Sequence, residues 1–134
     1  MLNVTVKAFA VSHGEVPHAF GYRVETPDRT IVISGDTSPN QNVIDACNGC
    51  NVLVHEVYTT KGHDAAAASW QAYQVKYHTS SKQLAELATK ARPKLLILYH
   101  QVYLFYTSTR EDLRREMRDV YKGQFVSGLD LEIY

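Results

Sequence analysis

The 134-residue chain lacks several features that would assign it to a particular class of protein. Its 14 Lys and Arg residues balance its 14 Asp and Glu residues, so it has no excess of positive charge for binding nucleic acid or an acidic membrane. No apolar run is long enough to span a membrane, and the N-terminus shows no signal-peptide pattern. We therefore expect a cytoplasmic protein, and neither a membrane nor nucleic acid is an expected partner.

Cysteine is also scarce, and the two present, Cys47 and Cys50, are too few for a disulfide framework. Their spacing occurs in zinc knuckles, but no second pair accompanies it. They lie at the end of a predicted helix, whereas a thioredoxin-type motif lies at a helix start, where the helix dipole lowers the thiol pKa. We expect two small, half-buried thiols.

The composition that remains is that of an ordinary globular protein, with 45% hydrophobic and 21% charged residues. The length is typical of one domain and sufficient for a hydrophobic core. No repeat, low-complexity tract or linker divides the chain. We expect residues 1–134 to form a single domain.

The beginning of the chain predicts the antiparallel part of a sheet. Apolar and polar residues alternate over residues 2–11, and a second strand is expected over residues 19–25. A turn around Pro27 then leads into the apolar stretch at residues 31–33. Strands linked in this way pair as hairpins.

A strand–turn–helix corner follows. Gly35 permits a tight exit from the strand and places Asp36 at its carboxyl end. Ser38 is predicted to cap a helix over residues 39–48, with Gln41 positioned to complete a capping box.

The rest of the chain alternates between strands and helices. The predicted elements are strands over 52–54, 95–99, 125–126 and 131–133, a helix capped by Ser80 that ends before Pro93, and a helix capped by Ser108 or Thr109 that runs to Lys122. The continuous apolar runs at 52–54 and 95–99 are typical of strands that are buried on both faces. The pattern therefore indicates an α/β fold with a mixed sheet.

Three further stretches allow simple interpretations. Residues 59–77 predict a short helix with an aromatic stripe, which would either line a substrate as an active-site flap or act as core filler that covers the sheet edge. The charged residues of the helix over 109–122 predict a solvated face with i, i+4 pairs. A second aromatic group would stack on a substrate or form an interface; its members are Tyr99, Tyr103, Phe105 and Tyr106.

Residue types that bind metals recur at the ends of the predicted strands. His13, Asp36, the pair at 55–56 (His-Glu) and His100 each follow a strand, and His78 precedes a capped helix. Ligands bind at the carboxyl ends of strands in open α/β sheets, and imidazole and carboxylate are ligands for zinc, manganese and iron. Alternatively, Asp36 only holds its turn and each histidine is an ordinary hydrogen-bonded residue. We favour a metal site because so many candidates share this position.

Five segments together resemble the metallo-β-lactamase superfamily, and most closely its ribonuclease Z and arylsulfatase-like hydrolases. They are residues 11–24 (VSHGEVPHAFGYRV), 34–37 (SGDT), 52–56 (VLVHE), 78–80 (HTS) and 96–100 (LILYH). Their order and spacing match along nearly the whole chain, except residues 59–77. The resemblance implies half of an αββα sandwich, in which a mixed sheet carries helices on one face.

The resemblance also implies a catalytic centre with two metal ions. His13 and His100 would each bind one ion and Asp36 would bridge the two, with zinc expected and manganese or iron as alternatives. Glu56 would hold His78, which would give a proton to the leaving group. The implied activity is hydrolysis of a small-molecule phosphodiester, sulfate or other ester, since paired ions activate water and neutralise the developing charge.

One motif of that family, a His-x-His-x-Asp-His run, is missing, because no two of the six histidines are separated by a single residue. Each ion would then have about two protein ligands, fewer than a catalytic zinc site uses. We therefore expect the C-terminal half of a hydrolase, weakly active or inactive alone. Its uncovered sheet face would pair with a second copy or with a separate N-terminal half. The alternative is a non-catalytic remnant of the fold that self-associates in a binding or structural role.

Overall fold

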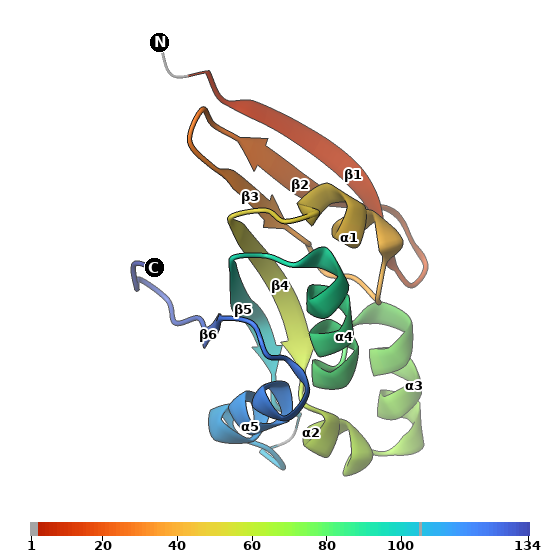
Figure 1. The fold of residues 1–134 in the computed structure, drawn as a ribbon. Helices are drawn as coiled ribbons and strands as arrows, with labels where there is room; N and C mark the ends of the chain where they lie inside the picture. Colours follow the sequence, from red (N-terminus) through yellow and green to blue (C-terminus); the bar gives the residue numbers. More distant parts are fainter. Residues whose placement is uncertain (1–2, 105) are drawn as a thin grey trace.

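The computed structural model describes residues 3–104 and 106–134 and contains one six-stranded mixed sheet with helices (Figure 1). Strand order in the sheet follows chain order, antiparallel from β1 to β3 and parallel from β3 to β6. The elements are β1 (Thr5–His13), β2 (Val16–Glu25), β3 (Thr30–Ile33), α1 (Gln41–Cys47), β4 (Val52–Tyr58), α2 (Thr60–Asp64), α3 (Ala68–Tyr77), α4 (Ser81–Ala91), β5 (Leu95–Val102), α5 (Arg110–Val120) and β6 (Phe125–Ser127). The predicted α/β class is confirmed.

One face of the sheet is covered by helices α1, α4 and α5 and holds the hydrophobic core. The strand register places Val32, Leu53 and Leu96 side by side on β3, β4 and β5, and all three are fully buried. Leu84 of α4 and Met117 of α5 pack into the same cluster. Burying one such side chain contributes roughly 1.5–3 kcal/mol, so this cluster stabilises the fold strongly.

The opposite face, which we call the open face, is also apolar, yet it carries none of these three helices. One row of paired residues crosses all six strands on this face and consists of Ala8, Tyr22, Ile33, Val54, Ile97 and Val126. Tyr22 is 44% exposed, whereas Ile33, Val54 and Ile97 of β3, β4 and β5 are half-buried. The arrangement agrees with the predicted sheet that has helices on one face.

Helix α1 begins later than predicted. Its N-cap is Asn40, not Ser38, and Gln41 bonds the Asp45 carboxylate instead of completing a capping box. The Ser38 hydroxyl donates to the carbonyl of Ser12, 3.2 Å away, and so fastens the preceding loop to β1. The predicted cap was wrong because a contact distant in sequence uses that hydroxyl.

The other two predicted caps have the expected chemistry. Ser80 and Gln83 form a capping box at the start of α4. Thr109, rather than Ser108, caps α5, and Asp112 completes the box. Each cap of this kind contributes about 1 kcal/mol to helix stability.

The two cysteines form a disulfide, so the expectation of two thiols is wrong. Helix α1 ends at Cys47, and Asn48 and Gly49 both adopt positive φ angles of 36° and 85°. This left-handed turn brings the Cα of Cys50 to 4.7 Å from that of Cys47, within the range that a disulfide spans. The bridge lies in the hydrophobic core.

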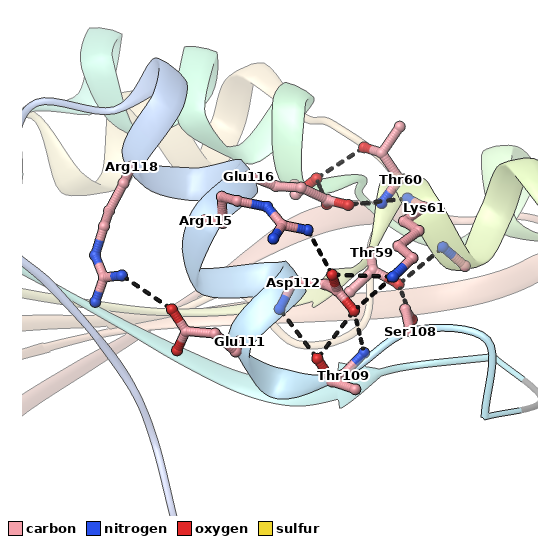
Figure 2. A network of polar contacts seen from close by, with 12 residues as sticks. Thr59, Thr60, Lys61, Ser108, Thr109, Glu111, Asp112, Arg115, Glu116 and Arg118 are labelled. Carbon is pink, nitrogen blue, oxygen red and sulfur yellow. Dashed lines mark hydrogen bonds and ion pairs between the residues drawn. The ribbon is translucent and has the colours of Figure 1, made fainter.

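The charges of α5 do more than form a solvated face, which corrects the prediction (Figure 2). Asp112 is buried and accepts hydrogen bonds from Lys61 and Arg115, and the bond from Lys61 contributes most to holding its pKa at about 2. Glu116 accepts the backbone N–H groups of Thr60 and Lys61, each at 2.9 Å. These contacts fasten α2 onto α5.

Other segments also differ from prediction. Residues 59–77 form two helices instead of one, and residues 131–133 form no strand. Of the second aromatic group, Phe105 lies outside the described residues and Tyr106 is fully exposed. Across residues 3–104 and 106–134, no helix combines the length and apolarity that crossing a bilayer requires. The cytoplasmic location stays a prediction.

Candidate metal centre

Asp36 and His100 meet at the carboxyl ends of the central strands, and His78, which follows α3, joins them there. One ligand atom from each lies within 4.8 Å of the others. Asp36 Oδ2 is 3.5 Å from His100 Nε2, which is close to the spacing of about 3.4 Å between two ligands of a tetrahedral ion with bonds of about 2.1 Å. Carboxylate and imidazole, which Asp36 and His100 offer here, are donors that suit zinc, manganese or iron. These residues therefore fit the kind of ion that was predicted.

Asp36 is delivered by a turn that only glycine allows. Gly35 has a φ of 66°, and a Cβ at this position would lie 2.6 Å from the carbonyl oxygen of Phe20. Beyond Asp36, the hydroxyl oxygen of Thr37 accepts the backbone N–H of Ser12 at 3.2 Å. The carboxylate therefore sits on a loop that is held at both ends.

His100 is the extra residue of a bulge in β5. Glu56 pairs with Tyr99 and Val57 pairs with Gln101, so no residue of β4 lies opposite His100. Its φ of 41° is in the left-handed region, which costs an L-residue roughly 1–2 kcal/mol. Bulges redirect a side chain at the edge of a sheet, and here the imidazole turns toward Asp36.

His13 lies beside this cluster. Its Nδ1 is 2.9 Å from the carbonyl oxygen of Tyr77, so Nδ1 carries the proton and Nε2 is left to act as a ligand. Its ring centroid is 5.3 Å from that of His78. The distance brings His13 to the candidate centre, and its assignment as a metal ligand stays a prediction.

Glu56 forms a buried pair with His78, a member of the cluster. Glu56 Oε1 accepts the backbone N–H groups of Thr37 and Thr79, both at 3.1 Å, and lies 3.3 Å from His78 Nδ1. That last contact has the distance of an ion pair but not the angle of a hydrogen bond, and Glu56 Oε2 has no partner. The predicted partners thus lie together, and their catalytic roles stay predictions.

The surroundings raise the pKa of both members of this pair. Burial raises the pKa of Glu56 and outweighs the opposing effects of His78 and of the Thr37 N–H. Burial alone would lower the pKa of His78, but the neighbouring Glu56 carboxylate outweighs it and raises that pKa above its ordinary value. The two groups together therefore hold a proton more tightly than either does in water.

Two threonines that support the site, Thr37 and Thr79, were not identified from the sequence. The hydroxyl of Thr79 donates to the carbonyl of Thr37 at 2.6 Å, and the backbone N–H groups of both residues bind Glu56. Both are fully buried. The available signal was their position inside the SGDT and HTS segments, each directly after a candidate site residue.

His55 does not join the site. It is fully buried on the helix-covered face, where its Nδ1–H donates to the backbone carbonyl of Glu56 at 2.7 Å. Burial lowers the pKa of His55 to about 4, so its imidazole is neutral in the core.

Sequence comparisons identify relatives of the chain. A family model described as "Beta-lactamase superfamily domain" matches residues 1–101. A ribonuclease Z of Mycobacterium sp. (strain KMS) is 28% identical over 128 residues, which cover 96% of this chain and 45% of that protein. A ribonuclease Z of Enterococcus faecalis is 33% identical over 106 residues, which cover 78% of this chain and 32% of that protein.

Solved structures show the same fold. The metallo-beta-lactamase fold protein YhfI from Bacillus subtilis superposes with a TM-score of 0.71 at 20% identity, over 91% of this chain and 44% of that one. Human tRNase Z, short form, gives a TM-score of 0.55 at 27% identity, over 73% of this chain and 36% of that one. This chain thus spans less than half the length of these relatives. The chain belongs to the metallo-β-lactamase superfamily and is similar to ribonuclease Z within it.

Proposed function

We propose that this chain supplies part of a metal-dependent hydrolase centre that acts on a phosphodiester, sulfate or other ester. The observation that carries the proposal is the convergence of Asp36, His78 and His100 within 4.8 Å at the end of the sheet. Asp36 and His100 would hold the metal, with His13 as a further ligand. Zinc is the proposed ion, and manganese and iron are the alternatives.

In this proposal each residue has one task. A bound metal would supply an activated water and neutralise charge on the substrate. His78 has its Nδ1 beside Glu56 Oε1, which leaves Nε2 to donate a proton to the departing oxygen. The backbone N–H groups of Thr37 and Thr79 keep the Glu56 carboxylate in place.

The centre would be completed by another polypeptide segment. His13, Asp36 and His100 give fewer ligands than two catalytic ions require, and the sequence has no His-x-His-x-Asp-His run. The ribonuclease Z relatives are more than twice as long as the part that this chain matches. We therefore propose weak or no activity for the chain alone.

The test is hydrolysis by the metal-loaded protein. Bis(p-nitrophenyl) phosphate, p-nitrophenyl sulfate and p-nitrophenyl acetate would be assayed with zinc, manganese or iron supplied. Asp36→Asn and His78→Gln are expected to abolish any turnover, whereas His18→Gln, at an exposed position on β2, is expected to leave it unchanged. If no ion binds, or if Asp36→Asn and His78→Gln leave turnover unchanged, the proposal is rejected. Metal binding without turnover is the result expected if the chain needs another segment to complete the centre.

A second candidate function is a non-catalytic, self-associating role, and the open face favours it. A large apolar surface is normally covered by a partner. We propose that the open face packs against that of a second copy about a two-fold axis. Sedimentation is then expected to show a dimer that Tyr22→Lys dissociates and that Glu86→Lys, on the helical side, does not. A monomeric wild-type chain would reject the dimer and favour a separate N-terminal half as the partner.

A further inference from the structure

The aromatic residues of α3 do not fill the core. Gln74 is the only buried residue of this helix, whereas Trp70 is 44% and Tyr73 is 41% exposed. A helix that is held by the core buries an apolar stripe, and α3 has none. Trp70 and Tyr73 are therefore not core filler, although α3 does contact β1 at the edge of the sheet.

These rings form a series that leads away from the candidate metal centre. We call Trp70, Tyr73 and Tyr77 the aromatic wall. The ring of Tyr73 stacks on that of Tyr77 with centroids 4.6 Å apart, and Trp70 meets Tyr73 edge-on at 5.7 Å. The Tyr73 centroid is also 5.9 Å from that of His78. The wall therefore begins at a residue of the centre.

A pocket lies at the outer part of the wall. Its volume is about 360 Å³, and it is lined by Ser69, Trp70 and Tyr73. Because Tyr73 contacts both this pocket and His78, a ligand that stacks in the pocket would extend toward the centre.

The inner end of the wall is fixed to the β1–β2 turn. The Tyr77 ring occupies the space where a side chain at position 14 would lie, since a Cβ on Gly14 would come within 2.1 Å of it. Lys76 pairs with Glu15 at 2.6 Å, and the Tyr77 carbonyl accepts the His13 bond. A wall that is held in this way loses little freedom when a ligand stacks on it.

We propose that Trp70 and Tyr73 form a stacking subsite for a planar aromatic ring that is linked to the anionic group of the substrate. Placing the anionic group of the substrate at the metal centre rests on the proposed function, whereas the contact with the ring rests on the aromatic wall alone. Nucleotides and aryl esters share this chemistry. Exposed aromatic faces stack on such rings, and the contact would distinguish these substrates from aliphatic esters.

The chain's single tryptophan is Trp70, so its fluorescence reports binding at the wall directly. The protein would be titrated in zinc with AMP, phenyl phosphate and ribose 5-phosphate. We expect AMP and phenyl phosphate to quench the fluorescence of Trp70, and the one that binds more tightly will indicate the type of ring. Ribose 5-phosphate is expected to bind more weakly and without quenching. Equal affinity for all three would overturn the proposal.

Substitutions at Tyr73 sharpen the test. Tyr73→Leu, which keeps apolar bulk and removes the ring, is expected to weaken AMP binding by about 10-fold, within the range for loss of one stacking contact. Tyr73→Phe restores a ring and is expected to restore the affinity, and Tyr106→Ala, at a fully exposed position elsewhere, serves as the control. An unchanged affinity in Tyr73→Leu would contradict the subsite.

A zinc-free arm separates this proposal from the proposed function. Adenosine, which has the ring but no phosphate, is expected to quench Trp70 weakly and in a Tyr73-dependent way without zinc. If zinc fails to bind but this quenching persists, the metal centre fails and the subsite stands. If zinc binds and the ring adds nothing, the subsite alone is rejected.

Discussion

The body of the sheet differs from the carboxyl ends of its central strands, which we call the carboxyl edge, in how its residues are stabilised. In the body, Leu53 and Leu96 are fully buried among other apolar side chains. At the edge, Glu56 is a buried carboxylate with an unpartnered oxygen, and His100 has a positive φ. Local features that cost stability persist at functional sites. The contrast indicates that the body holds the fold, and it supports the proposal that the functional site lies at the carboxyl edge.

The largest expected effect comes from breaking the body. Leu53→Ala removes a fully buried side chain and is expected to lower the free energy of unfolding by about 2–5 kcal/mol. Urea denaturation would measure this loss. Zinc affinity of the folded variant is expected to equal that of the wild type, and a weakened zinc site would show that body and edge are not separate.

Acid is expected to lower the stability of the fold through His55. Its folded pKa of about 4 lies below its unfolded value of 6.5, so the unfolded state binds more protons as the pH falls from 6.5 toward 4. Stability present above pH 6.5 is therefore lost over this window, by roughly 3 kcal/mol in total. His55→Asn keeps the donor to the Glu56 carbonyl and is expected to show a flatter pH profile. Identical profiles would contradict this cause of acid sensitivity.

A substitution at the carboxyl edge is expected to raise the free energy of unfolding instead of lowering it. His100→Gly relieves the left-handed backbone and is expected to raise the free energy of unfolding by about 1 kcal/mol while weakening zinc binding at least about 10-fold. Asn48→Gly is the matched control, because Asn48 also has a positive φ and lies at the end of α1. It should gain stability with no change in zinc affinity. A loss of stability in His100→Gly would contradict the assignment of strain to the edge.

Local signals predicted much of the body. The Ser80 cap needs only Gln83, three residues away, so it could be predicted from sequence. The Ser38 cap failed because its hydroxyl binds Ser12, which is distant in sequence. The disulfide was missed because it depends on the left-handed turn at Asn48.

The edge was only partly predictable. Apolar runs predicted that Asp36 and His100 follow strands. Asp36 does lie beyond β3, whereas His100 lies within β5, which continues to Val102. The bulge that turns His100 depends on the register with β4, and no local pattern encodes that register. The support of Glu56 by Thr37 and Thr79 joins three segments, and only the folded chain brings them together.

The most direct test of the account is a calorimetric zinc titration of the wild type and three variants. We expect the wild type to bind zinc, and Asp36→Asn and His100→Gln to bind it at least about 10-fold more weakly, since each loses one ligand. His18→Gln should match the wild type, because His18 is exposed on β2. Equal zinc affinity in all four proteins, or no binding by the wild type, would contradict a metal centre at the carboxyl edge.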